Sequence, residues 1–328
     1  GTSISRGGVS LKRINEVINS EVKQEQGKNI SKIKGDIEFK NVSLVYKDQN
    51  ESEKTVLKDI SFKIKSGTKN AILGPTAGGK TQIFYLISGL VSPNNGEIFI
   101  DNEPMSSYKT SELLSNIGLV FQDSIVFNTN FRDNIAFSLK TTDESLQKAI
   151  NTSELDEFVK TLPNGLDTMI SERGTSLSGG QKQRLMLARA LAINPTILLL
   201  DDFTARVDAN TEKSILNNVA NNYKDVTLVS ITQKVEPIKH YDNIIVIMEG
   251  EVVAQGKHED LLKNSFEYRQ IYESQMSTEN IEKEIKQNNI AIDKKSKINK
   301  KVNSKVIKTK TKGIAKTSVK TNKYDKKT

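Results

Sequence analysis

The segment from Gly74 to Thr81 carries the clearest chemical pattern in the sequence. It fits the spacing G-x-x-x-x-G-K-[ST], and its residues are Gly74, Pro75, Thr76, Ala77, Gly78, Gly79, Lys80 and Thr81. Glycines at this spacing let backbone N–H groups point inward around phosphate groups. Lys80 can reach the β- and γ-phosphates of a nucleotide, and the Thr81 hydroxyl can bind Mg²⁺. An ordinary glycine-rich turn is the alternative, and the Lys-Thr pair argues against it.

Such a loop needs a strand before it and a helix after it. Asn70 to Leu73 is a short apolar run that predicts the strand, and residues 82–89 have helical character. A second apolar run, 197–200, predicts a buried strand that ends at Asp201. A carboxylate at the carboxyl end of a central strand, beside a phosphate loop, is placed to hold Mg²⁺. A helix N-cap is the alternative role for this aspartate.

The remaining pattern alternates strands with helices, which is typical of an α/β fold. Residues 127–192 are mostly helical, with a break at 163–165, and this stretch resembles an inserted subdomain. Further strands are expected at 37–46, 56–65, 117–121 and 226–231, and a hairpin at 244–248 and 251–254.

The run Leu177-Ser178-Gly179-Gly180-Gln181 resembles the signature of the ATP-binding domains of ABC transporters. Ser178 is a good N-cap for a helix whose amino terminus faces an anion. The resemblance covers about residues 36–275. It implies an α/β fold: a phosphate-loop ATPase core with an antiparallel β subdomain and an inserted α-helical signature subdomain.

The same resemblance assigns roles to individual residues. Tyr46 matches the aromatic residue that stacks on adenine. Gln122 matches the glutamine that senses Mg²⁺ and couples to the transmembrane part. The signature residues match those that contact the γ-phosphate of ATP on the opposite subunit. The ATP-binding set is therefore Tyr46, Gly74, Pro75, Thr76, Ala77, Gly78, Gly79, Lys80, Thr81, Gln82, Ser178, Gly179, Gly180 and Gln181. The Mg²⁺ set is Thr81, Gln122 and Asp201, and the catalytic set is Asp202, Gln233 and Gln122.

Three segments resemble exporters in particular. They are Glu172-Arg173-Gly174, the stretch 121–135, and residues 12–17, which resemble a linker leaving the last transmembrane helix. We therefore expect the C-terminal part of a half-transporter at the cytoplasmic face of the cell membrane. Its expected parts are a linker helix at 1–25 after a transmembrane domain, the ABC domain at 26–275, and a Lys-rich tail at 276–328.

Two departures from the family pattern affect catalysis. Asp202 stands where most ABC domains have Glu, and Gln233 stands where most have His. This pair resembles the degenerate half of a heterodimeric ABC exporter, which binds ATP at its own phosphate loop but hydrolyses it poorly. Its partners would then be a second half-transporter and the transmembrane domains. The alternatives are a slow homodimeric exporter ATPase and a soluble regulatory ABC protein.

Composition limits the other possible functions. The chain has 328 residues, no cysteine and a net charge of +8. Residues 276–328 hold 16 Lys and 5 acidic residues, so this tail has a net charge of +11 and residues 1–275 have −3. A nucleic-acid partner for the main body therefore gains no support. The tail could contact an anionic membrane surface, and a solvated extension is the alternative.

Overall fold

The computed structural model describes residues 27–30, 32–47, 52–75, 79–122, 125–170 and 177–276. By its internal contacts the chain divides into two units, residues 1–269 and residues 270–328. In the second unit the structure describes residues 270–276, which include the end of helix α10 (Phe266–Gln275). The first unit contains both sheets and the candidate site. The expected linker helix at 1–25 and nearly all of the tail lie outside the described residues.

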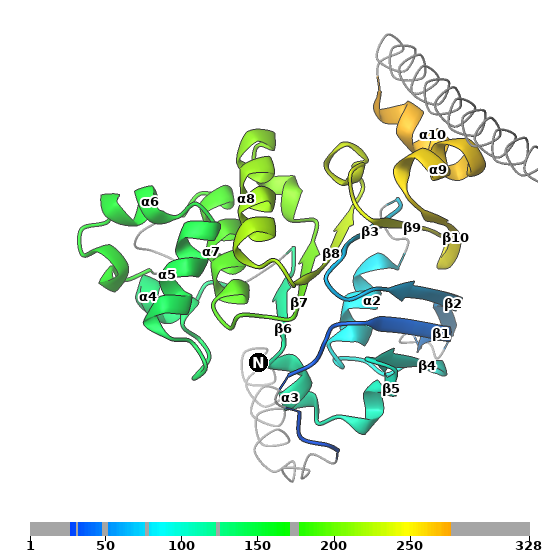
Figure 1. The fold of residues 1–328 in the computed structure, drawn as a ribbon, viewed down its shortest axis with the longest axis horizontal. Helices are drawn as coiled ribbons and strands as arrows, with labels where there is room; N and C mark the ends of the chain where they lie inside the picture. Colours follow the sequence, from blue (N-terminus) through cyan, green and yellow to red (C-terminus); the bar gives the residue numbers. More distant parts are fainter. Residues whose placement is uncertain are drawn as a thin grey trace, which may run out of the picture. The chain divides into compact units, whose positions relative to one another are not determined.

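A four-stranded antiparallel sheet forms one layer of the first unit (Figure 1). Its long strands alternate buried apolar residues with exposed polar ones, so one face packs on the core. The strands lie in the order β2-β1-β4-β5. They are β1 (Ile37–Lys47), β2 (Glu53–Ile64), β4 (Asn95–Ile100) and β5 (Glu103–Pro104).

A six-stranded sheet forms the second layer, and its strand order is β10-β9-β3-β8-β7-β6. All neighbouring strands are parallel except β10, which pairs antiparallel with β9 at one edge. The loops that follow β3, β7 and β8 therefore leave the same edge of the sheet. The strands are β3 (Lys69–Leu73), β6 (Ile117–Val120), β7 (Ile197–Asp201), β8 (Thr227–Thr232), β9 (Asn243–Met248) and β10 (Glu251–Gly256).

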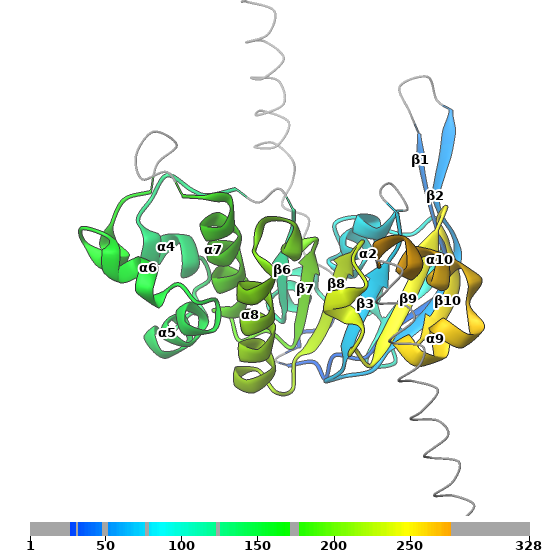
Figure 2. The same ribbon diagram turned by 90° about the horizontal axis from the view of Figure 1, so that it is seen from above.

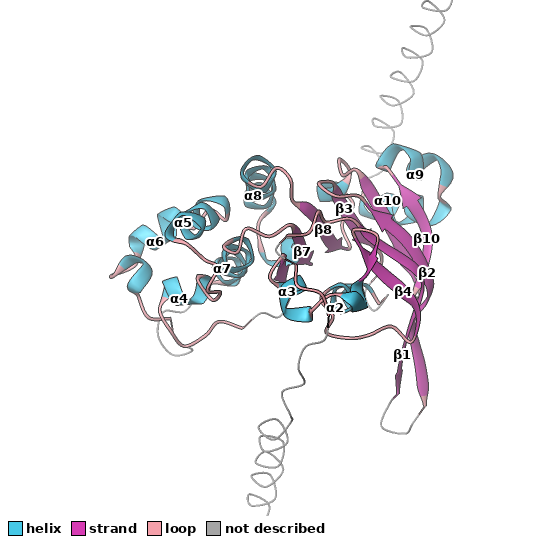
Figure 3. Cartoon of the chain, turned by 60° about the horizontal axis from the view of Figure 1, so that its bottom comes forward, coloured by secondary structure: helices cyan, strands magenta, loops and turns pink. Residues whose placement is uncertain are grey.

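The helices from α4 to α7 gather beside the β6 end of the parallel sheet (Figures 1 and 2). Figure 3 shows this region as a separate helical group, next to the strand-rich part of the domain. Besides α10, the helices are α2 (Lys80–Ile87), α3 (Thr110–Leu114), α4 (Phe131–Ile135), α5 (Asp143–Thr152), α6 (Asp156–Thr161), α7 (Gly179–Leu191), α8 (Ala209–Asn222) and α9 (His258–Asn264). Short 3₁₀ turns are η1 (Met105–Ser107), η2 (Gly165–Asp167), η3 (Phe203–Arg206) and η4 (Glu236–Ile238).

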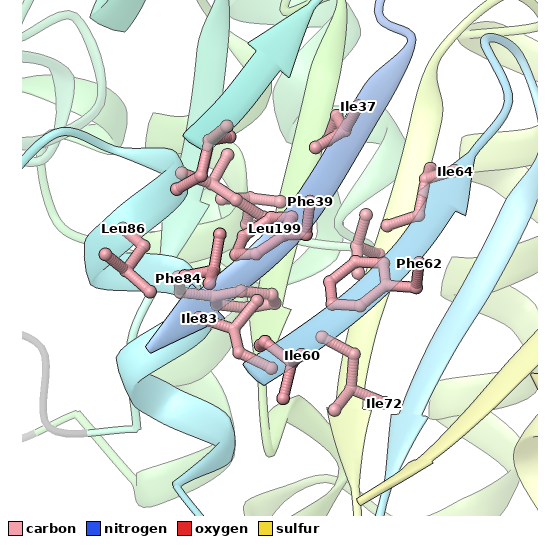
Figure 4. Close-up of a cluster of buried hydrophobic side chains, with 14 of the residues drawn as sticks. Ile37, Phe39, Ile60, Phe62, Ile64, Ile72, Ile83, Phe84, Leu86 and Leu199 are labelled. Carbon is pink, nitrogen blue, oxygen red and sulfur yellow. The ribbon is translucent and has the colours of Figure 1, made fainter. Parts of the chain in front are cut away.

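Helix α2 shares one hydrophobic core with both sheets (Figure 4). Ile83 and Phe84 of this helix are fully buried. The rings of Phe39 and Phe62 stack with centroids 4.5 Å apart, and Leu199 of β7 joins the same cluster. Burying each such side chain contributes about 1.5–3 kcal/mol. This core fixes α2 against both sheets.

The α/β architecture predicted from the sequence is confirmed. The expected strands and the hairpin around Gly250 are present, and the stretch 127–192 is mostly helical. The sequence analysis did not identify strand β4 or helix α8. Within the described residues, no helix is both long and apolar enough to cross a bilayer.

Candidate functional site

A cavity of ≈ 410 Å³ opens at the carboxyl edge of the parallel sheet, where β7 and β8 end. Nine of its lining residues were singled out from the sequence. The sequence analysis did not assign Lys54, Val56, Ile231 or Thr232 to the site, yet they also line it. The nine expected residues are Tyr46, Gly79, Lys80, Thr81, Gln82, Gln122, Asp201, Asp202 and Gln233.

The backbone around the phosphate loop requires glycine at two described positions. A Cβ on Gly74 would lie 2.1 Å from the carbonyl oxygen of Ile247. Gly79 has φ +81°, and a Cβ there would lie 2.8 Å from the carbonyl oxygen of Val56. A side chain at either position would therefore displace neighbouring backbone. Thr76, Ala77 and Gly78 lie outside the described residues, so their predicted contacts stay predictions.

Lys80 begins helix α2 and is buried, with 7% of its surface exposed. Its Nζ donates a hydrogen bond to the carbonyl oxygen of Pro75, within the loop itself. Burial lowers the pKa of Lys80, and the carboxylates of Asp201 and Asp202 oppose this shift. An ammonium group held in a poorly solvated position interacts strongly with an anion that enters the cavity. This placement suits a phosphate-binding lysine.

Thr81 and Asp201 form a hydrogen-bonded pair beside the cavity. Thr81 Oγ1 donates to Asp201 Oδ2 at 2.9 Å, and Asp201 is only 4% exposed. Burial raises the pKa of Asp201, and the hydrogen bond from Thr81 opposes that rise. Gln122, two residues after the end of β6, lines the same cavity. A hydroxyl, a carboxylate and an amide oxygen are hard oxygen donors, so these residues fit Mg²⁺.

Tyr46, near the end of β1, connects the antiparallel sheet to the site. Its ring is 38% exposed, and its hydroxyl donates a hydrogen bond to Gln82 Oε1 at 2.5 Å. Burial of part of the ring raises the pKa of Tyr46. Lys54 precedes the expected strand 56–65, and it lies opposite Tyr46 only because of the register in which β1 and β2 pair. The exposed ring beside the cavity is available for stacking on a nucleobase.

The two residues that depart from the family pattern lie at the same cavity. Asp202 directly follows β7 with φ 46° and ψ 39°, a left-handed conformation, and its N–H donates to the carbonyl oxygen of Ile231 at 3.0 Å. Gln233 directly follows β8. The carboxylate and the amide therefore approach the cavity from adjacent strands, where they could act on a water molecule and on a γ-phosphate.

The signature residues assigned to ATP binding lie apart from this cavity, because none of the residues 178–181 lines it. Ser178 caps helix α7 as expected: its Oγ accepts a hydrogen bond from Gln181 N at 3.2 Å, while Gln181 Oε1 accepts one from Ser178 N at 2.9 Å. Such a reciprocal capping box fixes the start of the helix. Gly179 and Gly180 form its first turn, close to Arg206. The capped helix predicted from the sequence is present, and in the structure it begins at Gly179, directly after Ser178.

A strand, a phosphate loop and a helix at the carboxyl edge of a parallel sheet define a phosphate-loop nucleotide-binding domain. Residues 57–205 match the family model described as ABC transporter. The domain is an ATP-binding domain of the ABC transporter family, of the type found in exporters.

Individual comparisons agree with this family. The chain is 39% identical over 245 residues to the uncharacterized ABC transporter ATP-binding protein YknU of Bacillus subtilis, which covers 74% of this chain and 41% of that protein. It is 36% identical over 262 residues to the leukotoxin translocation ATP-binding protein LktB of Mannheimia haemolytica, covering 79% of this chain and 36% of that protein.

A solved structure shows the same fold. A bacterial Atm1-family ABC exporter with ATP bound superposes with a TM-score of 0.73 at 30% identity, covering 84% of this chain and 48% of that one. The chain spans less than half the length of these relatives.

Proposed function

We propose that this chain is the motor domain of one half of a heterodimeric ABC exporter, and that its own site binds MgATP but hydrolyses it slowly. One observation carries the proposal. Asp202 and Gln233 line the same cavity as Lys80, Thr81 and Asp201, so binding groups of the usual kind face altered catalytic groups. The domain would work at the cytoplasmic face of a membrane, below transmembrane segments.

In this proposal the binding groups act before any chemistry. Lys80 and the amino terminus of α2 neutralise the phosphates, and Tyr46 stacks on the adenine. Thr81, Asp201 and Gln122 would hold Mg²⁺, which when bound offsets the charge of the β- and γ-phosphates. The hydrogen bond from Thr81 to Asp201 would hold these two side chains beside each other without nucleotide.

Catalysis is where this site is expected to be weak. A carboxylate must lie within hydrogen-bond reach of the attacking water. Asp202 is one methylene shorter than Glu, and a misplacement of about 1 Å can reduce a rate about 100-fold. Gln233 can donate a hydrogen bond to the γ-phosphate, but it carries neither a proton for transfer nor a positive charge. ATP should therefore stay bound and intact at this site.

The signature helix would serve the other site of the dimer. Its capped amino terminus is exposed and lies outside this chain's own cavity. A partner domain facing head to tail would place its γ-phosphate there, where helix N–H groups and the Ser178 hydroxyl bind anions. ATP-driven closure of the two domains would then supply the work, and hydrolysis at the partner's site would reopen the dimer.

A homodimer remains the second candidate, because one observation favours it. The chain carries both a phosphate loop and an intact signature, so two copies could form two sites of the same kind. Both sites would then be slow. The distinction lies in whether the chain closes on a copy of itself or on a different domain.

The fate of bound ATP tests the proposal. The chain is incubated with MgATP, separated from free nucleotide, and its bound nucleotide is identified over time. We expect stoichiometric binding, with the nucleotide remaining ATP over many minutes. Turnover of tens per second by the chain alone, which is typical of active enzymes, would refute the impaired site. Lys80→Met is the control that should remove retention.

A further inference from the structure

Helix α8 carries a buried carboxyl group that the proposed mechanism does not use. Glu212 is 5% exposed, and its Oε1 has no hydrogen-bond partner within the described part of the chain. The side chain does not line the ATP cavity. A buried acceptor with no partner is costly, so its presence calls for an explanation.

The charged and titratable groups around Glu212 come from three different segments. Lys234 follows Gln233 after β8 and favours the ionised form, whereas Asp202, after β7, disfavours it. Tyr241 is buried and responds to the charge of Glu212, and its hydroxyl lies 3.3 Å from Ser230 Oγ. Burial is the largest influence and raises the pKa of Glu212 to about 7.

Hydrogen bonds hold Glu212 in the capped first turn of α8. Its N–H donates to the carbonyl oxygen of Asp208 at 2.9 Å, and Asp208 Oδ1 accepts a hydrogen bond from Thr211 N at 3.0 Å. The short turn η3 joins Asp202 to this cap and also packs on α7, the signature helix. A shift of this turn therefore acts on Asp202 and on Glu212 together.

We propose that Glu212 is a positioning residue that couples the start of α8 to the two catalytic loops, through Asp202 on one side and Lys234 on the other. When protonated, its carboxyl can donate a hydrogen bond toward the Asp202 loop. When ionised, it repels Asp202 and attracts Lys234, which draws the loop carrying Gln233. The protonation state of Glu212 thus selects between two arrangements of these loops.

This coupling deepens the proposed function, because MgATP binding at the cavity must change the charge balance around Asp202. Binding and protonation are linked reciprocally: if MgATP shifts the titration midpoint of Glu212, the affinity for MgATP must depend on pH to the same extent. The linkage requires no turnover, so a slow site does not hide it.

The test is a ¹³C NMR titration of the Glu212 carboxyl in the full chain, with Glu212→Gln to assign the resonance. We expect a midpoint near 7. Without nucleotide, Asp202→Asn should lower the midpoint and Lys234→Met should raise it, each by half a unit or more. Glu236→Gln is the matched control: this glutamate is exposed and pairs with Lys239 at 2.8 Å, so its loss should leave the midpoint unchanged.

MgATP supplies the second arm. We expect it to move the midpoint by at least half a unit, so that its affinity changes about threefold between pH 6 and 8 in the wild type and stays constant in Glu212→Gln. A midpoint that neither Asp202→Asn nor Lys234→Met moves overturns the coupling. Binding of MgATP that leaves the midpoint of Glu212 unchanged also overturns the coupling. Failure to bind MgATP refutes the proposed function instead, and the two substitutions then still decide the coupling.

Discussion

The buried carboxyl of Glu212 should make the stability of the domain depend on pH. In the folded chain its pKa is raised from 4.5 to about 7, mainly by burial. Between these two values the folded state holds a proton that the unfolded chain releases. Stability must therefore fall as the pH rises through this window. The stabilisation of the folded state by the proton on Glu212 is fully present below about pH 4.5 and lost above about pH 7.

The size of this effect follows from the two pKa values. Each pKa unit corresponds to about 1.4 kcal/mol, so the shift from 4.5 to about 7 corresponds to about 3 kcal/mol. Glu212→Gln keeps the shape of the side chain and does not titrate, so it removes this dependence. Groups on which Glu212 has no influence, such as Asp201, titrate alike in both proteins, so their contributions cancel in the difference.

Urea unfolding of the wild type and Glu212→Gln, measured from pH 5 to 8, gives that difference directly. The wild type should lose about 2–3 kcal/mol relative to the variant over this range. Glu236→Gln, which replaces an exposed glutamate, should follow the wild type. A constant difference between wild type and Glu212→Gln would refute the reasoning, because Glu212 would then titrate alike in the folded and unfolded chain.

Three further predictions concern the site and the tail. Thr81→Ala removes the hydrogen bond to Asp201, so it should lower the free energy of unfolding by about 1.5–3 kcal/mol and abolish the Mg²⁺ dependence of ATP binding. Thr81→Ser should keep the stability and the Mg²⁺ dependence, and equal losses in the two variants would contradict the role of the hydroxyl. Ser178→Ala breaks the capping box with Gln181 and should cost about 1 kcal/mol, and in site-resolved nucleotide trapping it should impair the partner's site more than its own; loss confined to its own site would contradict the head-to-tail arrangement. Removing 276–328 should leave MgATP affinity unchanged, and a large loss of affinity would show that the domain boundary is misplaced. A loss of liposome binding on truncation that is seen at low salt and disappears at high salt would report a membrane contact of the tail.

The sequence was most informative where a local pattern has one structural solution. The phosphate loop predicted its strand and helix because glycine spacing and an adjacent apolar run allow few alternatives. Asp201 was placed correctly because the strand 197–200 is apolar throughout, as a buried parallel strand must be. The capping role of Ser178 also followed from residue type and position alone.

Other features depend on contacts between distant segments. Strand β4 begins with Asn95, Gly96 and Glu97, which gives it little strand character, and it forms because β1 offers a pairing edge. Lys54 reaches the site only through the register of β1 and β2. Glu212 has the sequence context of an ordinary glutamate in the first turn of a helix, yet the folded chain leaves it only 5% exposed. No local pattern encodes such burial.

Restoring the two altered catalytic groups tests the central claim most directly. Asp202→Glu combined with Gln233→His returns a carboxylate of full reach and an imidazole to a cavity that already contains Lys80, Thr81 and Asp201. Single-turnover hydrolysis of ATP bound at this chain's own site is measured in the wild type and in the double variant. The account predicts slow hydrolysis in the wild type and an increase of roughly 10- to 100-fold in the variant. Equal rates in the two proteins would contradict it, because Asp202 and Gln233 would then not limit the site.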